Sequence, residues 1–310
     1  MTPSPETGTP LSTSMNTPAS TPLRKFLSAY FESRLALLGL ILLAAILCAA
    51  VLAPWIAMQD PYDLAQLDIS DARRAPGSPA SDGLRHYLLG TDEQGRDMLS
   101  AILYGLRVSL FVGVSATLIA LSIGMTLGLI AGYVGGKVDA FIMRIADLQL
   151  SFPAILIALV LLAILGKGTG KIIIALVAVQ WAYYARTTRG VAIVERQKEY
   201  IDAAILLGLP VTRILFRHLL PNCLPPLVVV ATLQVAAAIA LEATLSFLGV
   251  GLPVTEPSLG LLIANGFQYL LTGKYWISFF PGAALLLTLV AINLVADRLR
   301  DVINPRLQVH

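Results

Sequence analysis

The first constraint on this chain is a run of uncharged residues long enough to cross a lipid bilayer. No charged side chain lies between Arg34 and Asp60. A helix needs about 20 consecutive apolar residues to span the hydrocarbon core. Only 13% of the whole chain is charged and 56% is hydrophobic, whereas a soluble domain has about 25% charged residues. So much apolar surface cannot be buried in a globular core, so the sequence predicts an integral membrane protein.

Further stretches have the length and apolarity of membrane-spanning helices. The next charge-free run lies between Arg107 and Lys137. We therefore predict an all-α membrane protein with about six spans. The predicted spans are 35–57, 108–133, 144–165, 170–189, 223–247 and 277–297. An even number of spans would place both ends of the chain on the same side of the membrane.

The positions of Lys and Arg predict which side that is. With the N-terminus inside, the inner segments carry 14 basic residues and the outer segments carry 8. Cytoplasmic segments of membrane proteins are enriched in Lys and Arg. Trp55, Tyr275 and Trp276 fall at predicted outer ends, where amphipathic rings prefer to lie. The sequence therefore predicts that both termini are cytoplasmic.

The predicted outer loop at 58–107 contains a turn-rich cluster followed by an apolar pattern. Asp97 is placed to cap a helix there. One interpretation is a structured loop with an interfacial helix. The other is a docking surface for a soluble partner outside the membrane. The residues of that surface would be Asp92, Gly95, Arg96 and Asp97.

Two features lie inside the predicted spans. Glu242 is the one acid deep in an apolar run, and an ionisable group at that depth is a candidate functional residue. It would face a polar cavity or the translocation path, or make a hydrogen bond between helices. Gly124, Gly128 and Gly132 form a narrow strip that lets another helix approach closely. That helix would belong either to this chain or to a partner.

The sequence shows no constellation of an enzyme. It has no H-E-x-x-H and no G-x-S-x-G pattern, and its three histidines are isolated. The run LGKGTGKI is not a phosphate-binding loop, because Leu165 and Ile172 occupy the places of the required glycine and hydroxyl residue. We therefore predict no catalytic residue, no metal site and no cofactor in this chain.

The segment EYIDAAILLGLPVTRILFRHLLPN breaks the apolar pattern between two predicted spans. Glu199 and Asp202 stand at its front, where acids suit the positive end of a helix dipole. Apolar residues then recur at helical spacing until Gly208 and Pro210, which would end the helix. A strip of small residues suits close contact with the groove of another protein. This strip consists of Ala203, Ala204 and Gly208.

A second short helix is expected after Pro210. Arg213 and Arg217 stand four residues apart on one of its faces, and Pro221 would close it just before the next span. The whole segment is predicted to be a helix–turn–helix elbow on the cytoplasmic side.

This elbow resembles the coupling segment of ATP-binding-cassette (ABC) importer permeases. Such segments carry an acid-Ala-Ala triplet, a glycine four residues later, and Leu-Pro about a dozen residues further on. The matching residues are Asp202, Ala203, Ala204, Gly208, Leu220 and Pro221. LLGTDEQGRDMLSAILYGLRVSL, TLSFLGVGLP and FFPGAALLLTLVAINLVADRLRDVINPR are similar to the second permease of dipeptide and oligopeptide importers. The resemblance covers about 24–308.

The resemblance implies a type I importer permease fold in a bacterial inner membrane. The chain would form half of a peptide translocation path with a homologous second permease. Two cytoplasmic ATPase subunits would bind ATP and Mg, and an extracytoplasmic binding protein would deliver substrate. One ATPase groove would receive the segment at 199–208. An importer of nickel, glutathione or another small ligand remains open, as do a proton-coupled carrier and a membrane scaffold.

The same expectations divide the chain into five parts. We predict a disordered tail, an N-terminal transmembrane helix, a periplasmic loop, a core permease domain and a cytoplasmic tail. Their ranges are 1–23, 24–57, 58–107, 108–300 and 301–310, with the coupling segment at 199–221.

Overall fold

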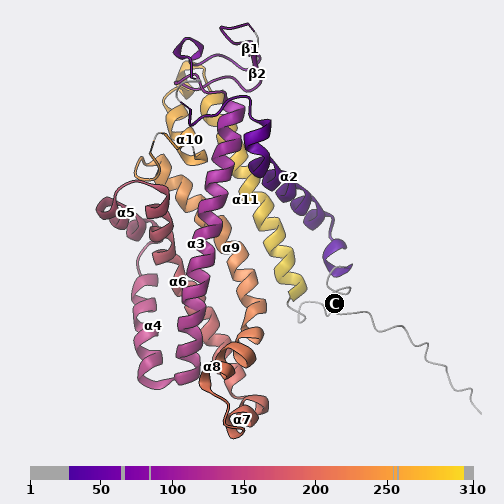
Figure 1. The fold of residues 1–310 in the computed structure, drawn as a ribbon, viewed down its shortest axis with the longest axis vertical. Coiled ribbons are helices and arrows are strands. Elements are labelled where there is room, and N and C mark those ends of the chain that lie inside the picture. Colours follow the sequence, from indigo (N-terminus) through magenta and orange to yellow (C-terminus); the bar gives the residue numbers. More distant parts are fainter. Residues whose placement is uncertain (1–27, 64–66, 84, 254, 257, 304–310) are drawn as a thin grey trace, which may run out of the picture.

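The computed structural model describes residues 28–303, apart from 64–66, 84, 254 and 257. The predicted disordered tail at 1–23 lies outside the described residues. Residues 301–303 of the predicted cytoplasmic tail form the end of a helix, and the rest of that tail also lies outside them. The described chain is an elongated bundle of helices (Figure 1).

The helices of the bundle follow in chain order. The long ones are α2 (Arg34–Ile56), α3 (Met98–Val134), α4 (Gly136–Leu150), α5 (Ala154–Leu165), α6 (Thr169–Arg196), α9 (Leu220–Phe247) and α11 (Trp276–Ile303). The short ones are η2 (Ile69–Asp71), α7 (Glu199–Leu206), α8 (Val211–Arg213), η3 (Ile214–Leu219), α10 (Leu259–Phe267) and η4 (Leu270–Thr272). Strands β1 (Ser78–Pro79) and β2 (His86–Tyr87) pair antiparallel, with Ser78 opposite Tyr87.

Within the described residues, four helices are long and apolar enough to cross a membrane. They are α2, α3, the continuous helix Val211–Phe247 and α11, and a fifth span results if α4 and α5 are counted as one broken span. Helix α6 is 28 residues long but is not among them, because polar and basic residues such as Arg186 and Arg189 interrupt its apolar run. The count of six spans and the sidedness of the termini therefore remain predictions.

The predicted interfacial helix in the outer loop is not a separate element. Residues 98–106 are the first turns of α3, which runs unbroken for 37 residues. Asp97 does cap this helix as predicted, since its side chain accepts a hydrogen bond from the Ser100 amide at 2.9 Å. No proline or positive-φ residue follows before the end of α3, so nothing stops the helix at the predicted boundary near 107.

The predicted span at 144–165 is two helices instead of one. Helices α4 and α5 meet at an angle of 92°. The break follows from Pro153, which stands just before α5. Proline has no N–H to donate and disfavours helical backbone at the preceding residue, here Phe152. Helix α4 instead runs beside α6, where Arg189 makes a bidentate ion pair with Asp139 at 2.5 and 2.6 Å.

Pro221 does not close a helix as the sequence suggested. Helices α8, η3 and α9 are continuous from Val211 to Phe247. Segment η3 is a wide, π-helical turn, in which the amide of Leu220 donates to the carbonyl of Leu215. Pro221 follows in the first turn of α9, where a missing N–H is tolerated. The turn therefore carries the chain past the proline without ending the helix.

The glycine strip of α3 packs inside this chain. Helices α3 and α6 share the most extensive helix contact (Figure 1). A Cβ added at Gly124 would lie 2.3 Å from the carbonyl oxygen of Trp181, and one at Gly128 would lie 2.5 Å from that of Ala185. Gly132 approaches the same helix. The strip therefore packs against α6. The sequence left open whether the approaching helix belongs to this chain or to a partner, and in the structure it belongs to this chain.

Candidate functional site

The elbow at 199–221 forms one end of the molecule. Figure 1 shows α7 and α8 at the lower tip of the bundle, at the opposite end from β1 and β2. Helix α7 ends as the sequence predicts. Gly208 has a positive φ of 67°, and the amide of Leu209 donates to the carbonyl of Ala204 while that of Gly208 donates to Ile205. This is a Schellman motif, which needs a glycine at its left-handed position.

One side of α7 packs against its own chain. Ile201 is 0% exposed and Ala204 is 4% exposed. Both belong to a buried apolar cluster that includes Tyr184 of α6 and Leu219 of η3. Ala204 therefore cannot contact a partner's groove, and this part of the predicted small strip is wrong. The reason is the helix period: Ile201 and Ala204 are three residues apart and turn to the same, inner face.

The C-terminal end of α7 and the residues just after it expose apolar side chains. Leu206 is 87% exposed and Leu207 is 78% exposed, and Ile205 and Val211 are about half exposed at 47% and 49%. We call these four residues the apolar tip. A contiguous exposed apolar patch commonly marks a protein-interaction site. Sequence reasoning missed it, although two leucines directly before a helix-ending glycine were a usable signal.

Exposed charged residues lie on the same short elements as the apolar tip and on η3, which directly follows α8. Glu199 and Asp202 on α7 are exposed, and so are Arg213 of α8 and Arg217 of η3. Among the described residues, none of these four forms an ion pair within the chain. Ala203, Gly208 and Pro221 are also exposed. An apolar patch with polar residues nearby is typical of protein–protein interfaces.

A polar brace holds the tip to the bundle. Glu195, in the last turns of α6, accepts hydrogen bonds from Lys198 Nζ at 2.5 Å and from the Tyr200 hydroxyl at 2.7 Å. Asn222 Nδ2 of α9 donates to the same hydroxyl at 3.0 Å. Burial acts to raise the pKa of Glu195, but its hydrogen bonds with Lys198 and Tyr200 outweigh this and lower the pKa. Burial and the Glu195 contact raise the pKa of Tyr200 to about 12.

The hydrogen bonds of Glu195 predict that α7 becomes less stable at acidic pH. Because the folded pKa of Glu195 lies below its unfolded value of about 4.3, the brace stabilises the tip above that value. This contribution is lost as pH falls through the folded pKa. Amide hydrogen exchange of α7 in nanodiscs is expected to speed up, relative to α9, below about pH 4. Glu195→Gln should flatten this pH dependence, and an unchanged dependence in that variant would show that the brace is not its source.

The residues predicted for docking at the outer end are buried. Asp92 and Arg96 are both 1% exposed, and Asp97 and Gly95 are also buried. They build the loop itself: Asp92 Oδ1 accepts hydrogen bonds from the amides of Gln94 and Arg96. These four residues therefore cannot present a docking surface, and that prediction is wrong. A turn rich in Asp and Gly folds back on itself because its side chains satisfy its own amides.

Glu242 ties two helices together. It is 0% exposed. Ser109 of α3 donates a hydrogen bond to its Oε2 at 2.9 Å, and Ser246 of α9 donates to Oε1 at 2.7 Å. The hydrogen bond between helices that the sequence left open is confirmed. The side chain is enclosed by protein and does not line an open path in this structure.

Structural comparison gives the class of fold. The fold is similar to that of a chain of the MetNI methionine ABC transporter, solved in inward-facing conformations. The TM-score is 0.54, the match covers 66% of this chain and 97% of that chain, and 20% of aligned residues are identical. The likeness shows the fold alone: this is an integral membrane chain with the type I ABC importer permease fold.

Sequence comparison gives the family. The chain belongs to the family described as the binding-protein-dependent transport system inner membrane component, which matches residues 124–309. Residues 21–76 match the N-terminal transmembrane domain of oligopeptide transport permease C. The resemblance drawn from the elbow is thus confirmed, and the chain is a multi-pass permease subunit of the inner membrane.

Several curated relatives match over nearly the full chain. The di/tripeptide transport system permease protein DppC of Pseudomonas aeruginosa (strain UCBPP-PA14) is 37% identical, over 94% of this chain and 97% of its own. The dipeptide transport system permease protein DppC of Escherichia coli (strain K12) is 41% identical, over 93% and 94%. A putative peptide transport system permease protein of Brucella suis biovar 1 (strain 1330) is 41% identical, over 88% of each chain.

Proposed function

We propose that this permease subunit imports di- or oligopeptides, driven by ATP. The substrate class rests on the names of the relatives, each of which is a peptide, dipeptide or di/tripeptide permease. The single observation that carries the coupling role is the exposed apolar tip, which is held in place because α7 packs through Ile201 and Ala204 and is braced through Tyr200.

The working assembly would contain several partners. A homologous second permease would complete the path as a heterodimer, and an extracytoplasmic binding protein would deliver the peptide. Two cytoplasmic ATPase subunits would bind ATP and Mg, while this chain would contribute no catalytic residue. With both termini inside, α7 faces the cytoplasm, where the ATPases lie.

Force would pass from the tip into the bundle by two routes. Ile201 and Ala204 pack α7 onto the cluster that joins α6, η3 and α9. The Glu195–Tyr200–Asn222 hydrogen bonds join α7 to α6 and α9 on the polar side. ATP binding can shift the permease only through contacts that differ between its two states. Because α7 is held on both its apolar and its polar side, it transmits a displacement instead of absorbing it. A short, stiff elbow therefore suits this position.

The experiment that tests the proposal is purification of the complete complex from its own membranes. The expected result is co-purification of two ATPase subunits and a second permease, with a binding protein whose bound ligand is a peptide by mass spectrometry. The complex is then reconstituted into vesicles with the ATPase subunits facing the interior. These vesicles should take up the peptide only when ATP is also enclosed. A bound nickel ion or glutathione instead would contradict the peptide assignment and leave the importer role standing.

The alternative function, a proton-coupled carrier, predicts a different effect of substituting Glu242. Such a carrier would lose uptake on Glu242→Gln and would work without ATPase subunits. We expect this variant to keep ATP-driven uptake within about threefold, since the glutamine amide can still share hydrogen bonds with Ser109 and Ser246. The measurement is initial uptake rate with and without ATP, together with the effect of a proton ionophore.

A further inference from the structure

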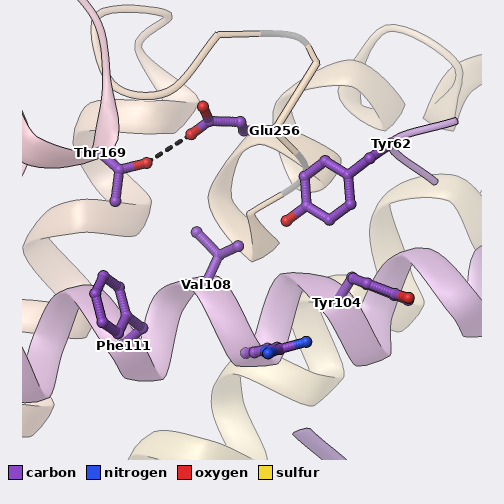
Figure 2. Close-up of a pocket in the computed structure, with 7 residues that line it drawn as sticks. Tyr62, Tyr104, Val108, Phe111, Thr169 and Glu256 are labelled. Atoms are coloured by element: carbon purple, nitrogen blue, oxygen red, sulfur yellow. Dashed lines mark hydrogen bonds between the residues drawn. The ribbon is translucent and has the colours of Figure 1, made fainter. Parts of the chain in front are cut away.

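A pocket of about 560 Å³ opens near the end of the bundle opposite the apolar tip. Figure 2 shows Tyr104 and Phe111 on α3, Tyr62 above them from the outer loop, and Glu256 with its neighbour Thr169 on the facing side. Arg107 of α3 also lines the pocket. A volume of this size falls within the range of about 300–1,000 Å³ that is usual for small-ligand sites.

The pocket carries two opposite charges on different walls. Glu256 lies in the segment before α10, and its Oε2 accepts a hydrogen bond from Thr169 Oγ1 at 2.5 Å. A carboxylate has about four acceptor positions, so most of its capacity remains. Arg107 is exposed, and it forms no ion pair with any described carboxylate. Two charges that line one pocket without pairing are available to a ligand.

The charges of Glu256 and Arg107 both affect the pKa of the Tyr62 hydroxyl. The pKa of Tyr62 is raised to about 12, first by burial and then by the charge of Glu256, while Arg107 acts in the opposite direction. Tyr62 therefore lies within electrostatic reach of both groups. Figure 2 shows its ring between Glu256 and Tyr104, and the two tyrosine rings meet edge to face with centroids 5.4 Å apart.

The remaining walls suit an apolar side chain and a cation. Aromatic faces attract ammonium groups and also pack against apolar groups. Tyr62, Tyr104 and Phe111 provide such faces around the two charges. A divalent metal ion is a poorer match, because Glu256 is the only carboxylate among the described residues that line the pocket and dedicated cation sites use several oxygen or nitrogen ligands.

We propose that this pocket receives a zwitterionic peptide at the outer mouth of the path, with Glu256 contacting the terminal ammonium and Arg107 contacting the terminal carboxylate. The inference rests on the proposed peptide import and deepens it, because it assigns residues of this chain to substrate selection. The pocket would bind both ends of the peptide after the binding protein has released it.

The test uses the complete complex of both permeases and both ATPases in nanodiscs, without binding protein. Equilibrium dialysis measures the affinity for three probes: the dipeptide Ala-Phe, its C-terminal amide and its N-acetyl form. Each charge-assisted contact is expected to contribute about tenfold in affinity. Wild type should bind Ala-Phe about tenfold more tightly than either blocked peptide.

The variants assign each charge to one peptide end. Arg107→Gln should weaken Ala-Phe binding about tenfold and leave the amide unaffected. Glu256→Gln should weaken Ala-Phe binding similarly and leave the N-acetyl form unaffected. Arg85→Gln is the control, since Arg85 is an exposed arginine of the outer loop that does not line the pocket. It should bind all three probes as wild type does.

Three results would overturn the pocket assignment. They are equal wild-type affinity for the three probes, no measurable Ala-Phe binding by wild type, or a variant that weakens the peptide blocked at the end it is assigned to as much as it weakens Ala-Phe. Loss of a partner subunit from Arg107→Gln or Glu256→Gln, seen as altered stoichiometry, would also count against it. ATP-driven uptake of Ala-Phe by wild type with its binding protein is measured separately, and its failure would contradict the proposed function instead.

Discussion

Replacing Leu206 and Leu207 together with Asp is expected to abolish ATP-driven uptake while the permease still folds. The two leucines are 87% and 78% exposed, so few contacts within the chain are lost. Burying a leucine in a partner's groove is worth about 1.5–3 kcal/mol, and each 1.4 kcal/mol is about tenfold. Loss of both should weaken attachment of the ATPase by about 100-fold or more. Uptake rate and ATPase co-purification are the measurements.

The matched control for this double variant is Leu271→Asp. Leu271 is 100% exposed in η4, and the same substitution there should leave ATPase binding unchanged. Thermal unfolding of the purified permease pair should differ little between the double variant and wild type. Normal uptake and normal ATPase co-purification by the double variant would show that the apolar tip is not the coupling surface.

Gly128→Leu is expected to prevent stable folding of the permease. A Cβ at this position would already lie 2.5 Å from the carbonyl oxygen of Ala185 and 2.7 Å from the Cβ of Thr188. The obstacle at Ala185 is helix backbone, which cannot rotate away as a side chain can. Overpacking a tight core typically costs about 1–3 kcal/mol and sometimes more, so helices α3 and α6 must separate. Yield of monodisperse protein and its melting temperature report the effect.

Gly190→Leu provides the comparison for that experiment. Gly190 lies in α6, and a Cβ there would meet no atom within 4 Å. This variant should fold, because leucine is a better helix former than glycine by roughly 0.5–1 kcal/mol. Gly128→Ala should fall between Gly128→Leu and wild type. Equal stability of the variants at the two glycines would mean that the close packing of α3 on α6 does not limit folding.

The sequence by itself determined the features that depend on local chemistry. Charge-free runs predicted membrane insertion, because lipid cannot solvate charged groups or unpaired backbone. Asp97 as a helix cap and Gly208 as a helix end were also predictable, since each acts on amides within a few residues of itself. The family followed from the elbow motif, whose residues adjoin one another in the chain.

Only the tertiary structure decided which face each residue turns to a neighbour. Ala204 proved to be buried and Leu206 exposed, the glycine strip proved to pack against α6, and Asp92 proved to support its own loop. The pocket joins Arg107 to Glu256, from segments far apart in the chain. Helical periodicity fixes which residues share a face, but the packing of distant segments fixes what that face contacts. That packing depends on the whole bundle, so it is not encoded in any short stretch of residues.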